Sequence, residues 1–172
     1  MAGGIGAASV RVAGITVAVP GLVETVPGVL RYGPSIGWRE VRVADELATR
    51  LARTKISEST RTRAAGRGPS AGGVTIRVDN YANLCALAEY VMGASAGTSD
   101  LVCLTGEIGV GAGMISDGPL LRGADGYGGE VGHTIVNPRG AMCRCGRRGC
   151  WETEIGADAV LQATGYGPGT PF

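Results

Sequence analysis

The chain of 172 residues has few aromatic residues, a single histidine and almost no net charge. Aromatic side chains make up 5% of it, and 16 lysines and arginines nearly balance 15 aspartates and glutamates, which leaves a formal net charge of +1. This balance gives no electrostatic reason to expect nucleic-acid binding. The sequence contains no run of about 18 apolar residues, which argues against a transmembrane helix. Its first residues also lack the charged and then apolar layout of a signal peptide.

Glycine is abundant instead. The 31 glycines follow no collagen-like period, a composition typical of α/β proteins with many tight turns and close backbone approaches. Hydrophobic residues make up 44% of the chain, enough for one sizeable core, so we expect one domain or two small lobes. The five cysteines are odd in number and mostly clustered, which fits a reducing cytoplasm better than a disulfide framework.

Strands and helices are expected to alternate along the chain. Runs rich in valine, isoleucine and leucine predict strands over residues 10–19, 74–78 and 101–105, with 114–115 resuming a paired strand. Apolar residues at helical spacing predict helices over 42–53, 82–97 and 157–164. This alternation indicates an α/β fold. No internal repeat is seen.

The segment 53–73 is polar, basic and poor in large apolar residues, which predicts a disordered surface insertion. Because basic residues outnumber acidic ones in this segment, a contact with RNA or DNA is the alternative interpretation. No aromatic residues are interleaved to stack on bases, so a solvated loop is favoured. The Gly/Pro-rich end, 165–172, is expected to fray.

The only histidine and three of the five cysteines lie close together near the end of the chain. They are His133, Cys143, Cys145 and Cys150. One imidazole and three thiolates are enough to close a tetrahedral shell around zinc. The Cys-x-Cys spacing is tighter than in most zinc motifs, so inert buried cysteines are the alternative on spacing alone.

The residues around these candidate ligands resemble the zinc loop of the ROK family, named for its repressors, open reading frames and sugar kinases. The matching motifs are Gly-Glu-Val-Gly-His at 129–133 and Cys-x-Cys-Gly-x-x-Gly-Cys-x-Glu at 143–152, and further matches spread over about residues 12–165. The resemblance implies an actin-like, ribonuclease H-like sugar kinase fold with two lobes and a cleft between them. It also implies that His133 and the three cysteines hold a structural zinc ion.

The same resemblance implies a sugar site. Glu130 and Glu152 match glutamates that contact sugar in the family, Asn80 matches a sugar-contacting asparagine, and His133 would turn its second ring nitrogen toward the ligand. Converging carboxylates and amides are the groups that bind hydroxyls. The alternative is that the glutamates are surface charges and Asn80 is only a turn residue. The joint match to one family pattern favours a pocket.

Two positions depart from the kinases of the family. Tyr81 stands where the kinases carry the aspartate that acts as general base, and a phenol with a pKa of about 10 is a poor base at neutral pH. Ser35 stands where the family pattern has an asparagine. We therefore assign no catalytic residue, with Tyr81 at the expected base position.

The glycine-rich run at 106–113 is the candidate phosphate loop, with Gly106, Gly109 and Gly111 as the residues that would approach phosphate. Glu107 replaces a small hydroxyl residue of the kinases and would repel a polyphosphate. No counterpart of the N-terminal phosphate loop precedes Val10, and the C-terminal part that completes the nucleotide site is missing. ATP is therefore not expected as a cofactor.

The motifs are more similar to the regulator branch of the family than to its kinases. Those regulators join a winged helix-turn-helix to a sugar-sensing domain, and no DNA-binding segment is recognised in this chain. The resemblance divides the chain into a remnant of the N-terminal lobe, about 1–80, and part of the C-terminal lobe, 81–172, with the zinc loop at 133–150.

We interpret the chain as the sugar-sensing ROK domain of a transcriptional regulator, incomplete at both ends and without its DNA-binding part. It is expected to bind structural zinc and a hexose or an N-acetylhexosamine, and to contact neither nucleic acid nor membrane directly. A homo-oligomer is expected because ROK proteins commonly form dimers or tetramers. The alternatives are an ATP-dependent, glucokinase-like sugar kinase that works through another base, and a decayed fragment without independent function.

Overall fold

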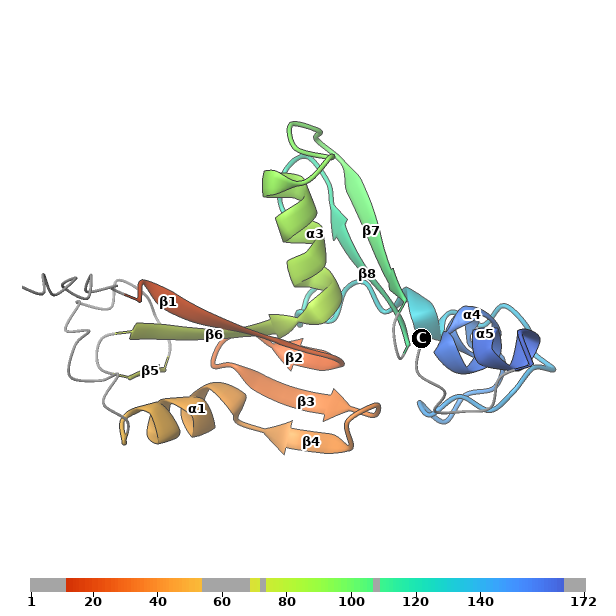
Figure 1. Cartoon of the computed structure of the whole chain (residues 1–172), viewed down its shortest axis with the longest axis horizontal. Coiled ribbons are helices and arrows are strands. Elements are labelled where there is room, and N and C mark those ends of the chain that lie inside the picture. The colour runs from red at the N-terminus through yellow and green to blue at the C-terminus, as the bar shows by residue number, and fades with distance from the viewer. Residues whose placement is uncertain (1–11, 54–68, 72–73, 107–108, 166–172) are drawn as a thin grey trace, which may run out of the picture.

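The computed structural model of the chain describes residues 12–53, 69–71, 74–106 and 109–165 (Figure 1). The helices and strands in these ranges form a mixed α/β structure of three small sheets with helices packed against them, as the alternation in the sequence predicts. The longest of the described helices has 12 residues, and none of them has the length and apolar character needed to cross a bilayer.

The first sheet contains the two strands that the sequence indicated most clearly. Strands β1 (Gly14–Val19) and β6 (Val74–Asn80) pair in parallel, and the two-residue strand β5 (Ser70–Ala71) adds to the other edge of β6. Parallel neighbours need a long connection. Here that connection carries a second sheet and a helix, so both pack close to the first sheet.

The second sheet is an antiparallel meander of β2 (Leu22–Glu24), β3 (Val29–Gly33) and β4 (Trp38–Val41), followed by helix α1 (Val43–Leu51). These elements and the first sheet bury a shared apolar core. The buried members are Val19, Val23, Leu30, Val43, Ala44, Ile76 and Val78, with the predicted helix positions Leu47 and Leu51 partly buried against them.

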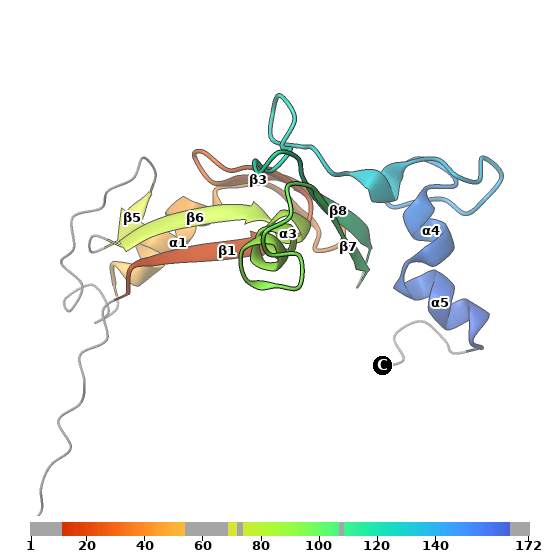
Figure 2. The same ribbon diagram turned by 90° about the horizontal axis from the view of Figure 1, so that it is seen from above.

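Helix α3 (Tyr81–Met92) begins directly where β6 ends and leaves the first sheet at a steep angle (Figure 1). It packs along the antiparallel hairpin of β7 (Leu101–Gly106) and β8 (Val110–Ile115), as Figure 2 shows from above. The approach is close because β8 carries Gly113. A Cβ atom on this glycine would overlap the carbonyl oxygen of Ala82 and the side chain of Ala86.

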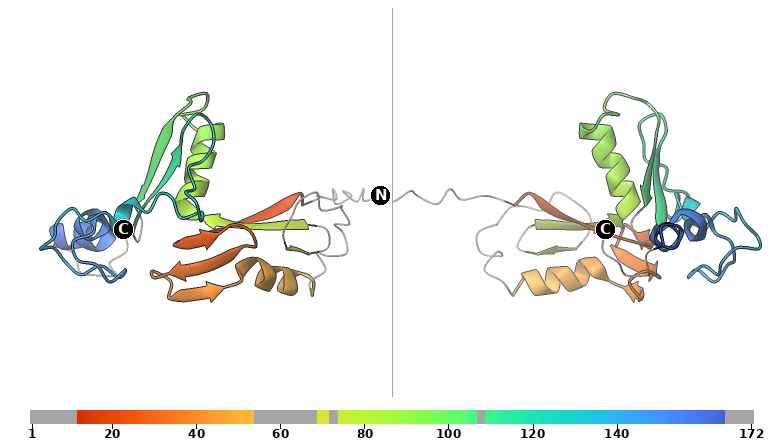
Figure 3. Two further views of the ribbon diagram at one scale, coloured as in Figure 1. Left: turned by 180° about the vertical axis from the view of Figure 1, so that it is seen from behind. Right: turned by 45° about the vertical axis from the view of Figure 1, so that its right-hand side comes forward.

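The last part of the described chain contains the one-turn helix η1 (Val131–His133) and helices α4 (Trp151–Ile155) and α5 (Ala157–Ala163). It lies at the opposite end of the molecule from α1 in both views of Figure 3. Its long loop is held by backbone bridges between Ile135 and Cys150 and between Met142 and Arg148. This part therefore depends on local connections more than on the apolar core of the sheets.

Element boundaries differ from the sequence predictions mostly by a few residues. Strand β1 starts at Gly14, α1 covers 43–51, β7 extends to Gly106, and the short last helix ends at Ala163. The largest error is helix 82–97, which ends at Met92. Gly93 there takes an extended conformation and its N–H caps the carbonyl of Glu89, so the helix stops.

The predictions missed strands β2, β3 and β4 and helix α4, and they took 114–115 for the start of a strand that begins at Val110. Strands of three to five residues and a five-residue helix carry little periodicity of their own. Within the predicted insertion 53–73, Ser70 and Ala71 form β5, whereas 54–68 and 72–73 lie outside the described residues. The predicted frayed end lies outside them beyond Gly165.

We predict that Gly113→Ala destabilises the fold by about 1–3 kcal/mol, because the new methyl group must push α3 away from β8. The matched control is Gly106→Ala on β7, where no described residue beyond the chain neighbours lies within 4 Å of the added Cβ and the effect should stay within about 0.5 kcal/mol. Urea unfolding followed by circular dichroism measures both. Equal midpoints for the two variants would contradict the close packing.

Candidate metal centre and adjoining cavity

Four potential metal ligands meet in the segment from η1 to α4. Ligand atoms of His133, Cys143, Cys145 and Cys150 all lie within 4.8 Å of one another. The Sγ atoms of Cys145 and Cys150 are 3.6 Å apart, and Nδ1 of His133 lies 3.7 Å from Sγ of Cys143. Zinc–sulfur bonds of about 2.3 Å place two sulfur ligands of a tetrahedron about 3.8 Å apart. The four side chains therefore fit a single tetrahedral ion.

Two glycines shape the loop that brings the thiols together. Gly146 follows Cys145 with φ +90°, and Gly149 precedes Cys150 with φ +71°, a region that other residues rarely adopt. A Cβ on Gly149 would overlap the backbone carbonyl of Asn137, so this glycine also allows the two sides of the loop to touch. The glycines of the Cys-x-Cys-Gly-x-x-Gly-Cys motif are thus required by the backbone.

The thiols do not share one electrostatic environment. Burial, together with the contact in which Cys143 donates to Oε1 of Glu152 at 2.7 Å, raises the pKa of the Cys143 thiol, and burial also raises the pKa of Cys150. For Cys145, the N–H of Arg147 and the neighbouring thiols outweigh the effect of burial and lower the pKa. A thiol with a raised pKa is a weak nucleophile, and a bound metal or a positive charge is needed to stabilise its thiolate near neutral pH.

His133 stands between the thiols and two carboxylates. Its Nδ1 faces Cys143 and lies 3.5 Å from Oε1 of Glu152, whereas its Nε2 lies 3.8 Å from Oε2 of Glu130. Burial raises the pKa of Glu130, and the nearby charge of Glu152 adds to this while His133 opposes it. The ring therefore connects the cluster with two acidic groups that lie beside it.

A cavity of about 1190 Å³ adjoins the cluster. Its lining includes all four residues that the sequence resemblance implied for sugar: Asn80, Glu130, His133 and Glu152. They come from the end of β6, the segment before η1, η1 itself and α4. The volume is more than sufficient for a small polar ligand. The structure thus brings together side chains that are up to 72 positions apart in the sequence.

Asn80 has a structural task as well as a place in the cavity. Its Oδ1 accepts hydrogen bonds from the N–H groups of Ala82 (2.8 Å) and Asn83 (3.4 Å) and so caps α3, and its Nδ2 donates to the carbonyl of Gly21 at 2.9 Å. The turn-residue reading is therefore correct in part. An amide nitrogen has two hydrogens, and only one is used in this bond.

Tyr81 and the glycine loop line the same cavity. Tyr81 is 38% exposed at the first position of α3. Gly109 and Gly111 belong to the lining, whereas the described residue Gly106 does not, and Glu107 lies outside the described residues. A Cβ built on Gly109 would lie 2.7 Å from Oε2 of Glu152, so a carboxylate covers this glycine. Negative charge at that place disfavours a phosphate group.

The sequence analysis missed one wall of the cavity. The β3–β4 hairpin contributes Tyr32, Pro34, Ser35 and Ile36 to the lining, and of these the sequence analysis named Ser35 alone, as a departure from the family pattern. Because the strands of this hairpin were not predicted, the sequence analysis did not place its turn in the same cavity as the candidate sugar residues. The nearby Gly-Trp pair, 37–38, was the available signal.

Comparison with known proteins shows two kinds of relatives. The model of the ROK family matches residues 70–168, more than half of the chain. The glucokinase of Thermotoga maritima is 36% identical over 132 residues, which cover 76% of this chain and 35% of that enzyme. The xylose repressor of Caldicellulosiruptor bescii is 45% identical over 86 residues, which cover 50% of this chain and 22% of the repressor.

A solved structure of a ROK family glucokinase from Streptomyces griseus, in complex with glucose and AMPPNP, is similar with a TM-score of 0.71 and 31% identity. The match covers 89% of this chain and 42% of that one. The similarity to ROK kinase structures implies the actin-like fold that the zinc-loop resemblance led us to expect. The chain spans about a third or less of the length of the curated relatives it matches.

Proposed function

We propose that this chain, which belongs to the ROK family, is the sugar-sensing part of a transcriptional regulator, with a structural zinc ion and a pocket for a hexose or an N-acetylhexosamine. The observation that carries the proposal is the cavity lined by Asn80, Glu130, His133 and Glu152, in which a phenol stands at the start of α3. This set offers hydrogen-bonding groups for hydroxyls, with a phenol in place of a carboxylate at the expected base position.

The zinc part of the proposal rests on the fit of the four ligand atoms to one tetrahedron. When bound, zinc would supply a fixed cross-link between η1 and the loop before α4. His133 would bind through Nδ1, which faces Cys143, and this leaves Nε2 on the side of Glu130. A reducing compartment such as the cytoplasm would keep the three thiols available as ligands.

The sugar part of the proposal follows from the groups that face the cavity. Carboxylates accept hydrogen bonds from neighbouring hydroxyls more strongly than neutral groups do. Glu130 and Glu152 lie on either side of the His133 ring, so they would receive two different hydroxyls of one sugar ring. The remaining N–H of Asn80 would donate from the end of β6. The glucose in the related glucokinase structure supports a ligand of this class.

One feature favours a regulator over a kinase. Tyr81 occupies the position at which the family resemblance places the catalytic aspartate of the kinases, and an ordinary phenol is a poor general base at neutral pH. The xylose repressor among the relatives agrees with this reading.

We expect the purified chain to carry about one zinc ion, and Cys145→Ser to lose it, because a serine hydroxyl is a poor zinc ligand. Cys85→Ser is the matched control, since Cys85 lies on α3 outside the cluster and its loss should leave the metal content unchanged. Atomic emission spectroscopy after dialysis measures both variants. A folded wild-type chain without metal would refute the zinc assignment.

Titration calorimetry with a panel of hexoses and N-acetylhexosamines should detect binding by the wild-type chain. Glu130→Gln and Glu152→Gln should each weaken it by roughly 10–100-fold, the loss expected when a charged hydrogen-bond acceptor becomes neutral. Glu154→Gln, two residues along on the exposed side of α4, is the matched control and should bind normally. Absence of heat with every sugar would count against the pocket.

The kinase alternative is supported by the similarity to glucokinases. We expect no ADP release from ATP with any sugar of the panel, because the cavity offers a phenol in place of a base. Tyr81→Asp, assayed in parallel, shows whether only the base is missing. Turnover by the unmutated chain would establish the kinase instead. The third alternative, a decayed fragment, would be contradicted by cooperative unfolding of the wild-type chain.

A further inference from the structure

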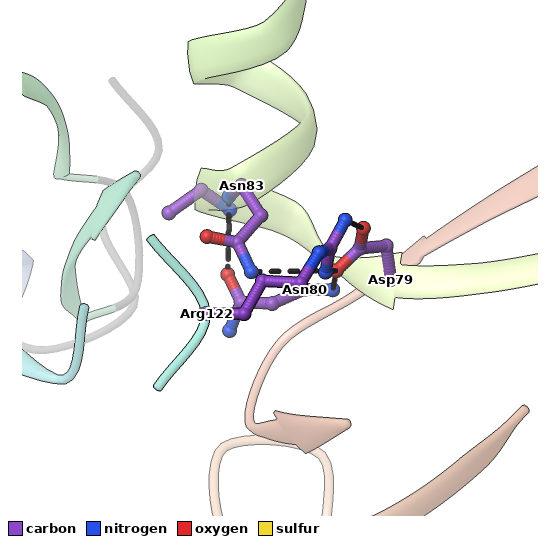
Figure 4. Close-up of polar contacts among 5 residues, drawn as sticks. Asp79, Asn80, Asn83 and Arg122 are labelled. Carbon is purple, nitrogen blue, oxygen red and sulfur yellow. Dashed lines mark hydrogen bonds and ion pairs between the residues drawn. The ribbon is translucent and has the colours of Figure 1, made fainter. Parts of the chain in front are cut away.

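A partly buried ion pair joins Asp79, near the end of β6, to Arg122. The carboxylate of Asp79 is 6% exposed and receives both arms of the Arg122 guanidinium, Nη1 to Oδ1 at 2.9 Å and Nη2 to Oδ2 at 2.6 Å (Figure 4). The N–H of Asn80 and Nδ2 of Asn83 also donate to Oδ1, at 2.8 and 3.3 Å. This bidentate geometry fixes both direction and distance between the two side chains.

Each partner of the ion pair is connected along the chain to a residue that lines the cavity. Asp79 directly precedes Asn80, whose side chain caps α3 and faces the cavity. Arg122 belongs to the segment 116–130, which connects β8 to η1 and ends at Glu130. Neither Asp79 nor Arg122 is among the described residues that line the cavity, so the pair would act through its neighbours.

Backbone contacts connect Arg122 with the residues just before Glu130. The N–H of Gly128 donates to the carbonyl of Arg122 at 2.7 Å. A Cβ on Gly128 would lie 2.8 Å from the carbonyl carbon of Arg122, so the two stretches are in direct contact. The next carbonyl, that of Gly129, accepts from Ala112 on β8. The backbone of Arg122 is therefore connected to the residues that directly precede Glu130.

The neighbouring polar groups are oriented toward the carboxylate of Asp79. Asn83 is 1% exposed and uses its Nδ2 for Asp79, while its Oδ1 has no hydrogen-bond partner among the described residues. A buried acceptor without a partner is destabilising. Its presence shows that the amide of Asn83 is turned to serve the carboxylate rather than to satisfy both of its own ends.

We propose that Arg122 is a positioning residue of the sugar pocket: by holding Asp79 in a bidentate pair, it fixes the segment that carries Glu130 relative to Asn80. The proposal rests on the proposed function, because it assigns Glu130 and Asn80 to one sugar site. It extends that function to a residue outside the cavity and across the junction between the first sheet and the β7–β8 hairpin.

The experiment compares Arg122→Met and Arg122→Lys in the full chain with Arg31→Met as the matched control, since Arg31 pairs with Glu24 and Glu40 at the surface. We expect Arg122→Met to weaken sugar binding by roughly 10–100-fold, the effect of a displaced contact group, with unchanged zinc content. Arg122→Lys should bind sugar more tightly than Arg122→Met, because the lysine ammonium keeps the positive charge. It should bind less tightly than the wild type, because an ammonium cannot form the bidentate pair. Arg31→Met should bind like the wild type.

Two further measurements separate positioning from general stability. Hydrogen–deuterium exchange should become faster at residues 123–131 in Arg122→Met and stay unchanged in α1. The double variant Asp79→Asn with Arg122→Met should bind sugar no more weakly than Arg122→Met alone, because both changes remove one pair. If Arg122→Met does not fold, Arg122→Lys decides by the same readouts.

Wild-type sugar affinity in folded Arg122→Met would overturn the positioning role. If the wild-type chain binds no sugar of the panel, the proposed function fails, and the exchange measurement then decides on Arg122 separately. Faster exchange at 123–131 in the variant would support the coupling of Arg122 to the Glu130 segment. Unchanged exchange there would refute it.

Discussion

One imidazole and three thiols converge in the last third of the described chain. Among the described residues after 115, the buried hydrophobic ones are only Cys143, Cys150 and Leu161, while larger apolar side chains there, such as those of Ile135 and Met142, are half exposed. So few buried groups supply little hydrophobic stabilisation. A cross-link through the four clustered ligand atoms would compensate for this, and it would act at the point where η1 meets the loop before α4.

The position of Glu130 shows how two separate attachments meet in the cavity. On its N-terminal side, Gly128 is hydrogen-bonded to the backbone of Arg122, whose guanidinium pairs with Asp79. On its C-terminal side, His133 belongs to the ligand cluster. A carboxylate held from both directions can be partly buried beside another carboxylate, an arrangement that raises its pKa and would not persist on a free loop. The two attachments therefore hold the carboxylate of Glu130 in the lining of the cavity.

The glycines that dominate the composition serve this close assembly. Gly113 lets α3 approach β8, and Gly149 lets the loop before Cys150 touch the backbone of Asn137. Gly109 leaves room for the carboxylate of Glu152. At each of these positions a side chain would have to displace backbone or a cavity residue. The glycines therefore serve close contacts between elements as well as turns.

Local patterns in the sequence were sufficient to predict the α/β class, the apolar stripe of α1, the resemblance to the family and the grouping of His133 with three cysteines. These depend on spacings of a few residues, which local chemistry decides. The same patterns did not reveal strands β2 to β4, which are too short to carry a period, or the end of α3 at Met92. The folded chain was needed to place the β3–β4 turn in the cavity wall and to join Asp79 to Arg122 across 43 positions. A contact of that separation depends on how the chain folds back, and no local pattern encodes it.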